Sequence, residues 1–510
     1  PWRPFVKPHF TLASIFTDHM MFQAGKPSYI FGKCLKRQEI RIRINGSTFR
    51  YKTTDTTFCF ELPAMPYIKE PFDFEVVCQN QKETIHNCLV GDIFIVSGQT
   101  NMKFPLKDTY ETKVKENPNI RLYQVPALPY ANAHLEFPDF YTNNAFWDTC
   151  NFESAMKFSA IGYFVAQILQ KEQNTPIGII SCCLDDSSIL SWAGIIELSQ
   201  TPEMQKYLSA YLSAYGKYRN INEYSDAFNS QLPKWYHFVE EIQANIRAGM
   251  TAEKGYFTAK KNNPSVELPM GPKHYNRPAG AFETMVSTIT PFSVCGVLFY
   301  QGESDCLNAA MYEDAFKTMI TSWRRGFQDI GLPFVLVQVA GYSYPDMPET
   351  ASAIIRESQA KCINFANNIF MTTAADLGEE NYLCPREKTV LANRLASVVL
   401  EKIYHCGKNT MAPALFSYRC VEGNIIIYTE YNNLNLVSRS KRNLGFKITK
   451  DEITFENVET DHIELSGNQI IIKDVKNIKE IRYNFTNFPH LDIYSTNDLP
   501  LLPFRIKITA

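Results

Sequence analysis

Apolar and polar residues alternate in two parts of the chain, before about residue 88 and after about residue 410. The stretch IRIRING, Ile40 to Gly46, alternates apolar and basic residues and then reaches an Asn-Gly pair, which is typical of a tight hairpin turn. A period of two places one face of a strand on a core and the other in solvent, as in antiparallel sheets. Short runs near the C-terminus are Asn424–Thr429, Gly445–Thr449, Gln469–Lys473 and Ile481–Phe485. The pattern predicts a β domain at each end of the chain.

Between about residues 89 and 405 the pattern changes to short, nearly continuous apolar runs separated by helical periodicity. The runs are Asp92–Val96, Ile177–Ser181, Val294–Tyr300, Phe334–Val339 and Ile369–Thr373. Such runs, rich in Val, Ile and Phe, are typical of buried parallel strands. Apolar stripes at helical spacing lie between them and include Ile161, Phe316 and Leu391. Alternating strands and helices predict an α/β domain with a parallel sheet, and functional residues at the carboxyl ends of its strands.

A chain of 510 residues is too long for one hydrophobic core, and the patterns predict three domains. They are an N-terminal β domain at 1–88, an α/β domain at 89–408 and a C-terminal β domain at 409–510. Residues from about 200 to 280 interrupt the α/β pattern, because they are rich in Tyr, Ser, Asn and Lys and contain no clear strand. We expect this segment to be a partly helical insertion.

Composition narrows the range of partners. Aromatic residues make up 13% and charged residues 20% of the chain, which indicates a folded globular protein. The net charge of −2 gives no reason to expect nucleic acid or an anionic membrane as a partner. No apolar run reaches the roughly 18 residues of a membrane-spanning helix. The chain begins at Pro1 without a basic and apolar leader, so we expect that any signal peptide has been removed or was never there.

The 13 cysteines are scattered, and no cluster has the spacing of a zinc site. We therefore expect no metal and no other cofactor. Disulfides are plausible if the protein is secreted, and the odd count leaves at least one thiol free or intermolecular. Two glycosylation sequons, at Asn45 and Asn484, are close to the number that chance would give.

Polar residues gather where four of the apolar runs end. The segments are SGQTNM (Ser97 to Met102), IISCCLDDSS (Ile179 to Ser188), YQGESD (Tyr300 to Asp305) and AADLGEENYLCPREK (Ala374 to Lys388). The first places a hydroxyl residue, Thr100, after a Gly turn, where an α/β hydrolase holds its nucleophile. Each segment alone also fits an ordinary turn, a helix N-cap or a solvated loop.

Together with other motifs, these segments resemble the sialate O-acetylesterases, within the wider group of SGNH-type esterases. The motifs are LASIFTDHMMFQ from Leu12, FSAIGYF from Phe158, TPIGIIS from Thr175, YQGESD from Tyr300, WRRGF from Trp323, PFVLVQVAGY from Pro333, IRESQ from Ile355, DLG from Asp376, PREK from Pro385 and LPLLPFR from Leu499. The resemblance covers nearly the whole chain and implies an SGNH-hydrolase-like parallel-sheet core flanked by β domains. It also implies hydrolysis of acetyl esters on sialic acid hydroxyls, by a Ser nucleophile and a His base without a metal. The implied location is outside the cell or in the lumen of lysosomes or other endomembranes.

The positions that would carry this reaction depart from the family pattern. Thr100 stands where the family has its nucleophilic Ser, and Cys384 stands where it has the catalytic His. Leu184-Asp185-Asp186 replaces a Trp-Gly-Gly segment near the site that stabilises the oxyanion. Gln301 and Glu303 of YQGES are kept. By the resemblance, we expect ligand contacts from Gln99, Asn101, Asp185, Asp186 and Tyr300.

Each of these substitutions is expected to slow or abolish ester hydrolysis, for chemical reasons. A thiol has a pKa of roughly 8.5 and no second nitrogen through which an acid could orient it, so Cys384 is a poor general base. The β-branch of Thr100 restricts χ1 in a crowded turn, and the carboxylates of Asp185 and Asp186 oppose a developing negative charge. The sequence therefore predicts a catalytically inactive relative, kept for glycan binding or for a structural role in a protein assembly. The alternative is an active sialic acid O-acetylesterase with Thr100 as nucleophile and another residue as base.

Overall fold

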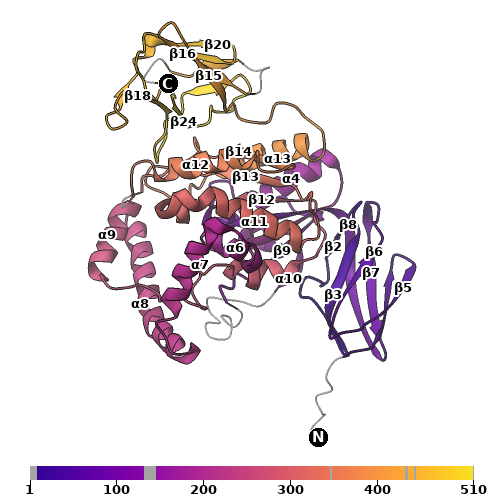
Figure 1. The fold of residues 1–510 in the computed structure, drawn as a ribbon. Coiled ribbons are helices and arrows are strands. Elements are labelled where there is room, and N and C mark those ends of the chain that lie inside the picture. The colour runs from indigo at the N-terminus through magenta and orange to yellow at the C-terminus, as the bar shows by residue number, and fades with distance from the viewer. Residues whose placement is uncertain (1–8, 131–144, 345–346, 431–434, 441–443, 509–510) are drawn as a thin grey trace. The chain divides into compact units, whose positions relative to one another are not determined.

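The computed structural model describes residues 9–130, 145–344, 347–430, 435–440 and 444–508 (Figure 1). The chain divides into two compact units. Unit 1 consists of Pro1–Lys217, Met270–Phe299 and Thr318–Phe334, and unit 2 of Tyr218–Pro269, Tyr300–Lys317 and Val335–Ala510. The division falls inside two strands, β12 (Gly296–Tyr300) and β13 (Phe334–Gln338). Each unit is described separately below.

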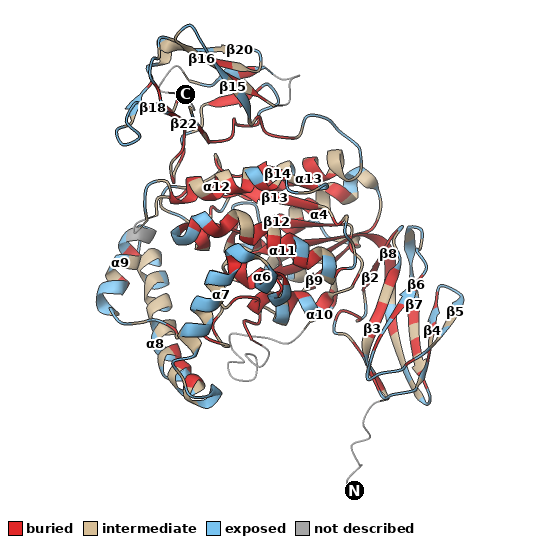
Figure 2. Ribbon diagram, in the orientation of Figure 1, coloured by how far each residue is buried: buried red, intermediate tan, exposed pale blue. Residues whose placement is uncertain are grey.

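Unit 1 begins with β strands whose alternating burial matches the alternating sequence. An antiparallel sheet has the order β1 (Phe10–Leu12), β3 (Ser28–Cys34), β6 (Thr57–Leu62). A second antiparallel set joins β4 (Glu39–Ile44) to β5 (Ser47–Lys52) and β7 (Ile68–Cys78), and β7 pairs with β8 (Gln81–Gly98). The predicted hairpin turn is confirmed, because Asn45 and Gly46 have φ of 44° and 76° and Ile44 pairs with Ser47. Figure 2 shows the alternation of buried and exposed positions along these strands.

The long strand β8 continues from this β region into the central sheet of unit 1. There the order is β10 (Trp147–Cys150), β9 (Asn117–Gln124), β11 (Ile177–Cys183), β8, β12. β11 runs parallel to β8 and β9, as predicted, whereas β10 is antiparallel to β9. The α/β fold class is therefore confirmed, with the correction that the sheet is mixed. The apolar-run criterion missed β9 and β10 because they carry polar residues, including Arg121.

Helices of unit 1 follow the strands. They are α1 (Thr100–Lys103), α3 (Phe152–Lys157), α4 (Ala160–Gln173), α5 (Ile189–Trp192), α6 (Ile195–Gln200), α7 (Pro202–Tyr215) and α10 (Ser287–Ile289), with a π-helical turn at Phe282–Val286. Ile161, Val165 and Leu169 of the predicted stripe on α4 are buried. α11 (Tyr312–Gly326) begins in unit 2 and ends in unit 1.

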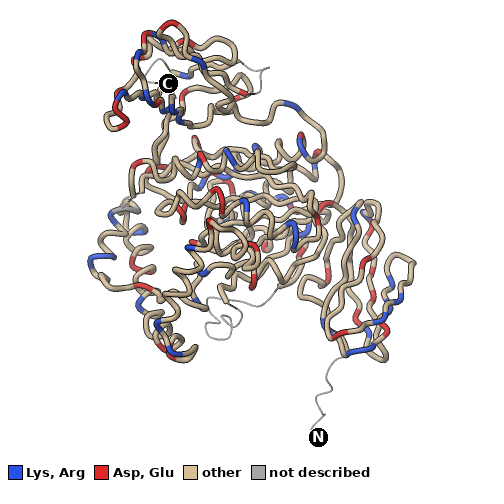
Figure 3. Tube along the Cα trace, viewed as in Figure 1, with Lys and Arg blue, Asp and Glu red and all other residues tan. Residues whose placement is uncertain are grey.

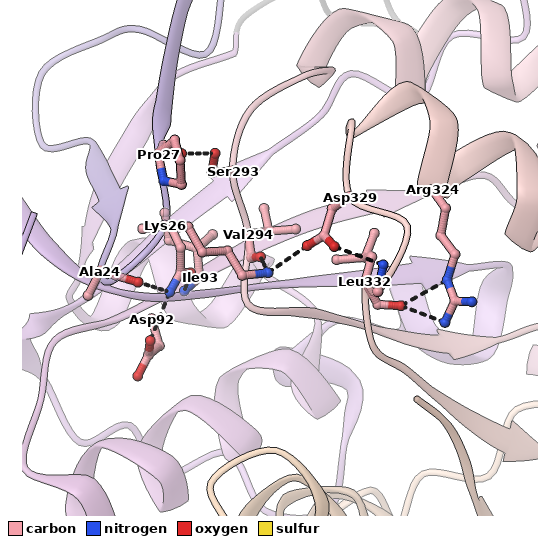
Figure 4. A network of polar contacts seen from close by, with 12 residues as sticks. Ala24, Lys26, Pro27, Asp92, Ile93, Ser293, Val294, Arg324, Asp329 and Leu332 are labelled. Carbon is pink, nitrogen blue, oxygen red and sulfur yellow. Dashed lines mark hydrogen bonds and ion pairs between the residues drawn. The ribbon is translucent and has the colours of Figure 1, made fainter. Parts of the chain in front are cut away.

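A polar network joins the end of β2 (Met21–Gln23) and the residues after it to the first core strand of unit 1 and to the segments around Val294 and Asp329. Gln23, the last residue of β2, donates to Asp92 at 2.9 Å and accepts from the backbone N–H of Ile93 at 2.8 Å. Lys26 donates to the carbonyl of Val294 at 2.9 Å and to Asp329 at 2.7 Å (Figure 4). Buried hydrogen bonds of this kind set the register of strands that start at a shared edge.

In unit 2, β13 (Phe334–Gln338) and β14 (Ile369–Thr373) are neighbouring strands. Each coincides with one of the apolar runs that were predicted to be strands. The helices are α8 (Ile221–Arg247), α9 (Ala252–Asn262), α12 (Ala351–Cys362) and α13 (Thr389–Lys402), with a 3₁₀ segment at Glu303–Met311. α8 and α9 pack on each other, and together with α7 they make the segment from about 200 to 262 mainly helical. The limits of the predicted insertion and of the three predicted domains stay predictions.

The C-terminal part of unit 2 is built from short antiparallel strands around its own core. One sheet has the order β15 (Leu415–Val421), β16 (Asn424–Thr429), β21 (Gln469–Ile472), β20 (Ile463–Ser466). A second has the order β19 (Glu456–Asn457), β18 (Phe446–Thr449), β22 (Glu480–Tyr483), β24 (Phe504–Lys507), and β17 (Leu436–Ser438) pairs with β23 (Ile493–Ser495). Ile427, Phe446, Ile470 and Ile481 lie in the common core.

Four further observations concern charge, membrane spans, metal ligands and cysteines. Acidic and basic residues are interspersed along the described chain (Figure 3). Within the described residues, no helix has the length and apolar character needed to cross a bilayer, and no group of three His, Cys, Asp or Glu side chains could hold a metal ion. All 13 cysteines lie in the described ranges, and each is a free thiol.

Candidate functional site

The turn after β8 in unit 1 presents Thr100 to solvent while burying its neighbours. β8 ends at Gly98 with φ of 130°, and Gln99 then starts the single turn of α1. Gln99 and Asn101 are each only 1% exposed, whereas Thr100 is partly exposed. The turn is closed by the backbone N–H groups of Met102 and Lys103, which both donate to the carbonyl of Gln99 at 3.0 Å. The local geometry therefore places the hydroxyl residue where a substrate could reach it.

The loop after β11, in the same unit, brings an acidic pair to this turn. The backbone N–H of Leu184 donates to the carbonyl of Gly98 at 3.0 Å, and the carboxylate of Asp185 forms an ion pair with Lys103 of α1. Asp186 adopts φ of 52°, the left-handed conformation that glycine favours and aspartate tolerates. The loop thus keeps a backbone shape suited to glycine while carrying two carboxylates.

The charge of Asp185 acts on its neighbour Asp186. The pKa of Asp186 is raised to about 6, first because surrounding protein atoms restrict its hydration and second because the Asp185 charge is near; Lys103 opposes this. The Asp186 residue is nevertheless exposed to solvent, and this exposure weakens the rise in its pKa that the surrounding atoms cause. At neutral pH this loop therefore carries more negative than positive charge.

His274 of unit 1 lies two residues before Asn276, whose side chain accepts a hydrogen bond from the backbone N–H of Ser188 at 2.7 Å. Its Nδ1 accepts from the backbone N–H of Asn276 at 3.0 Å, so the neutral ring carries its proton on Nε2. Burial lowers the pKa of His274 to about 4. A ring with this hydrogen bond and this pKa is a structural histidine and a poor general base.

In unit 2, the residues after β12 are buried and held by hydrogen bonds. Tyr300, Gln301 and Glu303 are at most 3% exposed. The Gln301 side chain donates to Asp305 at 2.6 Å, and its carbonyl accepts from the Tyr312 hydroxyl at 2.8 Å and from Gln359 at 2.9 Å. These contacts assign Gln301 a role in shaping the turn. Burial, followed by the charge of Glu303, raises the pKa of Tyr300 well above its usual value, so Tyr300 stays a neutral phenol.

The segment from Asp376 to Lys388 is anchored at both ends within unit 2. Asp376 accepts two hydrogen bonds from Arg394, at 2.7 and 2.8 Å, and both side chains are at most 10% exposed. Lys388 precedes α13, and its carbonyl accepts from the backbone N–H of Ala392 at 3.0 Å. Cys384 lies between these anchors and is partly exposed. Burial lowers the pKa of Lys388 to about 8, and the charges of Cys384 and then Glu303 oppose that shift.

The predicted site residues fall into two groups. Gln99, Thr100, Asn101, Asp185 and Asp186 lie in unit 1, and Tyr300, Gln301, Glu303 and Cys384 lie in unit 2. Within each group the fold brings residues distant in sequence together, and their catalytic or binding roles stay predictions. The sequon asparagines differ, because Asn45 is exposed on its turn whereas Asn484 is 8% exposed and packs against Gly445.

Sequence reasoning missed three residues that shape these groups: Lys103, Asp305 and Lys388. Lys103 is three positions after Thr100, on the same turn of helix, and that spacing could have drawn attention to it. Asp305 and Lys388 belong to the motifs YQGESD and PREK. Nothing in the sequence indicated that Lys388 is almost fully buried, since lysine is rarely an interior residue.

Comparison with known proteins agrees with the fold and with the motifs. Residues 270–401 match the family described as "Carbohydrate esterase, sialic acid-specific acetylesterase". The sialate O-acetylesterase of Rattus norvegicus is 22% identical and aligns with 98% of this chain and 95% of its own length. That of Homo sapiens is 22% identical over 76% of this chain and 69% of its own length. The crystal structure of a carbohydrate acetylesterase from Xanthomonas citri is 20% identical, with a TM-score of 0.76 over 98% of this chain and 100% of the other. The chain is therefore similar in sequence to the sialate O-acetylesterases over nearly its whole length, and similar in fold to a carbohydrate acetylesterase.

Proposed function

We propose that this chain is a catalytically inactive member of its family, retained for glycan binding or for a structural role in a protein assembly. The observation that carries the proposal is the thiol of Cys384. It occupies the position at which the resemblance places the catalytic imidazole, between the Asp376 anchor and the buried Lys388. The scaffold of this segment is intact while the group that would move the proton is absent.

The chemical consequence follows from the pKa of a general base. A base must take a proton from the nucleophile and return it to the leaving group, which imidazole does near neutral pH. The Cys384 thiol has no ring nitrogens, neither one to exchange the proton nor a second that an acid could orient, and it cannot serve in this way. Loss of the base or of the nucleophile in a hydrolase triad costs roughly 10⁶ in rate, so this one change is sufficient to abolish useful activity.

The acidic loop of unit 1 supports the same conclusion. Asp185 is tied to Lys103 on the turn that carries Thr100, and Asp186 occupies the left-handed position beside it. An ester hydrolase lowers its barrier by directing donors at a developing oxyanion, and losing one donor costs roughly 10²–10³ in rate. Carboxylates at this turn act against that stabilisation.

The retained glycan site is the first use that we propose, with sialylated or related glycans as ligands. Carbohydrate and sialate are the substrates named for the relatives, and the turn after β8 in unit 1 keeps the polar side chains of Gln99 and Asn101. The second use is contact with other proteins through the outer surface and the helices α7, α8 and α9. We place the protein outside the cell or in the lumen of lysosomes or other endomembranes, following the family. We expect no nucleic acid partner.

One observation favours a second candidate, an active sialic acid O-acetylesterase with Thr100 as nucleophile. Thr100 is partly exposed although both of its neighbours are buried, as a nucleophile must be. This candidate requires a base other than Cys384, and the hydrogen bond and low pKa of His274 argue against that histidine.

Acetyl release separates these candidates. The purified protein and its Thr100→Ala variant are compared with a small activated acetyl ester and with O-acetylated sialic acid. Equal release, at the uncatalysed rate, is the result we expect. Release by the native chain well above that of Thr100→Ala would overturn the proposal and identify Thr100 as a nucleophile. Binding of sialylated glycans by calorimetry then distinguishes a glycan receptor from a protein without glycan affinity.

A further inference from the structure

The alternating stretch IRIRING forms most of β4 and the turn after it, and its arginines lie on one face of a sheet in unit 1. Ile40, Ile42 and Ile44 are each at most 4% exposed, so they face the core. Arg41 and Arg43 alternate with them and therefore point to the opposite, outer face. The antiparallel register extends this outer face to β5, β7 and β8. These arginines take no part in the groups of candidate site residues described above.

The register of these strands places two arginines directly opposite each other. Arg41 of β4 pairs with Arg50 of β5 on one side and with Val77 of β7 on the other, so neither cross-strand neighbour is acidic. Arg50 is exposed and Arg41 is partly exposed, and neither forms an ion pair with any residue that the structure describes. Like charges directly opposite each other destabilise an antiparallel pair. An anion bound from solvent would relieve this repulsion.

The other charged side chains leave this outer face basic. Arg43 contacts Glu75 of β7 at 3.4 Å, and Lys82 of β8 pairs with the same carboxylate, so one acid is shared by two cations. Lys52 of β5 lies opposite Glu39 of β4. Figure 3 shows basic positions along β4 and β5. We call this surface the basic face; its cations are Arg41, Arg43, Arg50, Lys52 and Lys82, and its carboxylates are Glu39, Asp73 and Glu75.

The chemistry of the basic face indicates which polyanion it suits. A guanidinium group binds a sulfate or carboxylate group through two parallel hydrogen bonds. The rings of Phe49 and Tyr51 on β5 alternate away from this face, which leaves no Phe, Tyr or Trp among its described positions for nucleic acid bases to stack on. Val77 is the apolar side chain at those positions, which is too little to enter a lipid bilayer.

We propose that the basic face binds a sulfated polysaccharide of the glycosaminoglycan class, with Arg41 and Arg50 at the centre of the site. Such a chain carries sulfate and carboxylate groups at regular intervals, and several of them can contact arginines on neighbouring strands at once. Binding releases the counterions that surround both partners, so it weakens as salt increases. The site lies in the N-terminal strands of unit 1 and does not depend on whether Thr100 or Cys384 takes part in ester hydrolysis.

Calorimetry of the full chain with heparin tests the site. The double variant Arg41→Gln/Arg50→Gln is expected to weaken heparin binding by roughly tenfold or more, because it removes the central anion contacts. The matched control is Arg247→Gln/Arg419→Gln, which removes the same charge from two exposed positions in unit 2, on α8 and β15. It should change the affinity by less than about twofold. Absence of heparin binding by the native chain, or equal loss of affinity in the two double variants, would overturn the proposal.

Thermal unfolding gives an independent readout of the same pair of arginines. Heparin should raise the unfolding midpoint of the native chain more than that of Arg41→Gln/Arg50→Gln, because a ligand stabilises the folded state that binds it. Without heparin, the double variant should unfold at or above the native midpoint, since the repulsion between the opposed arginines is gone. A lower midpoint would show that the two arginines stabilise the sheet and would contradict their role in binding anions.

A second ligand separates polysaccharide from membrane. Vesicles of phosphatidylcholine with phosphatidylserine present anionic headgroups on a lipid surface, and the native chain is expected to bind them more weakly than it binds heparin. Vesicle binding that exceeds heparin binding and is lost in Arg41→Gln/Arg50→Gln would assign the basic face to an anionic membrane and overturn the proposed ligand.

Discussion

The turn after β8 and the turn after β12 both follow buried strands, but their polar residues differ in exposure and in hydrogen bonding. After β12, the carbonyl of Gln301 accepts from Tyr312 and Gln359, and its side chain donates to Asp305. After β8, Thr100 is partly exposed, and the charged contact near it is the Lys103–Asp185 pair, in which each side chain is at least 37% exposed. The turn after β12 is held by buried hydrogen bonds, whereas the turn after β8 leaves Thr100 and the Lys103–Asp185 pair accessible to solvent.

The difference shows which substitutions a fold tolerates. A buried polar group that loses its partner costs about 1–3 kcal/mol, whereas an exposed ion pair contributes about 0–1 kcal/mol. Residues such as Gln301 and Gln359 are therefore constrained by folding even in the absence of catalysis. Thr100 and Asp185 are constrained mainly by the reaction, and a chain that no longer performs it is free to vary there.

Gly302 gives the strongest test of the constraint after β12. It has φ of 151°, and a Cβ atom there would lie 2.8 Å from Ile355 and 2.9 Å from Val339. Gly302→Ala is expected to lower the free energy of unfolding by about 3 kcal/mol or more, because backbone strain and overpacking add. Gly407 is the matched control, since it also has positive φ, 93°, but nothing within 4 Å of its Cβ position. Thermal unfolding of Gly302→Ala at the midpoint of Gly407→Ala would contradict the packing argument.

Lys388 extends the comparison to a buried charge. Its pKa of about 8 in the folded protein is below the roughly 10.4 of an unfolded lysine, so the unfolded chain binds more protons between these values. This residue therefore makes the protein less stable below about pH 8, and stability is recovered as the pH rises toward 10. The Lys388→Met variant should be more stable at pH 7 by up to about 3 kcal/mol, with the difference shrinking toward pH 10. Urea unfolding at a series of pH values measures this trend, and a difference that grows with pH would contradict it.

Gln359 tests the hydrogen bonds that hold the Gln301 turn. Its amide donates to the carbonyls of Gln301 at 2.9 Å and Val337 at 3.3 Å and accepts from the backbone N–H of Val339 at 3.1 Å. Gln359→Leu should cost about 2 kcal/mol, because it leaves buried backbone groups without partners. Gln205→Leu removes a single exposed bond, of 3.2 Å to Ser199, and should change stability by less than about 0.5 kcal/mol. Similar unfolding midpoints for the two variants would show that the turn does not depend on these bonds.

The sequence predicted the strands that carry continuous apolar runs. Ile369–Thr373 and Asn424–Thr429 are strands over the same residues in the structure, because apolar burial and β propensity agree there. β9 was missed, since Asn117–Gln124 contains Pro118 and Arg121. Arg121 is nevertheless 2% exposed and donates to Asn87 at 3.0 Å. A partner supplied by another strand makes such burial feasible, and periodicity in one strand does not reveal that partner.

The candidate site was only partly predictable for a similar reason. The ends of the apolar runs indicated where polar residues gather, and the family resemblance singled out Thr100, Gln301 and Cys384 among them. The pairing of Lys103 with Asp185, 82 positions away, depends on how two loops meet. The burial of Lys388 likewise depends on the residues that pack around the start of α13. Long-range contacts of this kind require the structure.

The smallest expected effect concerns Thr100 itself. Thr100→Ser removes one methyl group from a partly exposed side chain, so stability should change by less than about 0.5 kcal/mol. Acetyl release should stay at the uncatalysed rate, because the serine would still lack a base at position 384. Adding Cys384→His supplies an imidazole, but Asp185 and Asp186 still oppose the oxyanion. Only the further change of both aspartates to glycine tests whether the turn after β8 has kept the geometry of a nucleophile. Strong release from Thr100→Ser alone would instead show that the chain possesses another base, and that the turn after β8 is still constrained by the reaction.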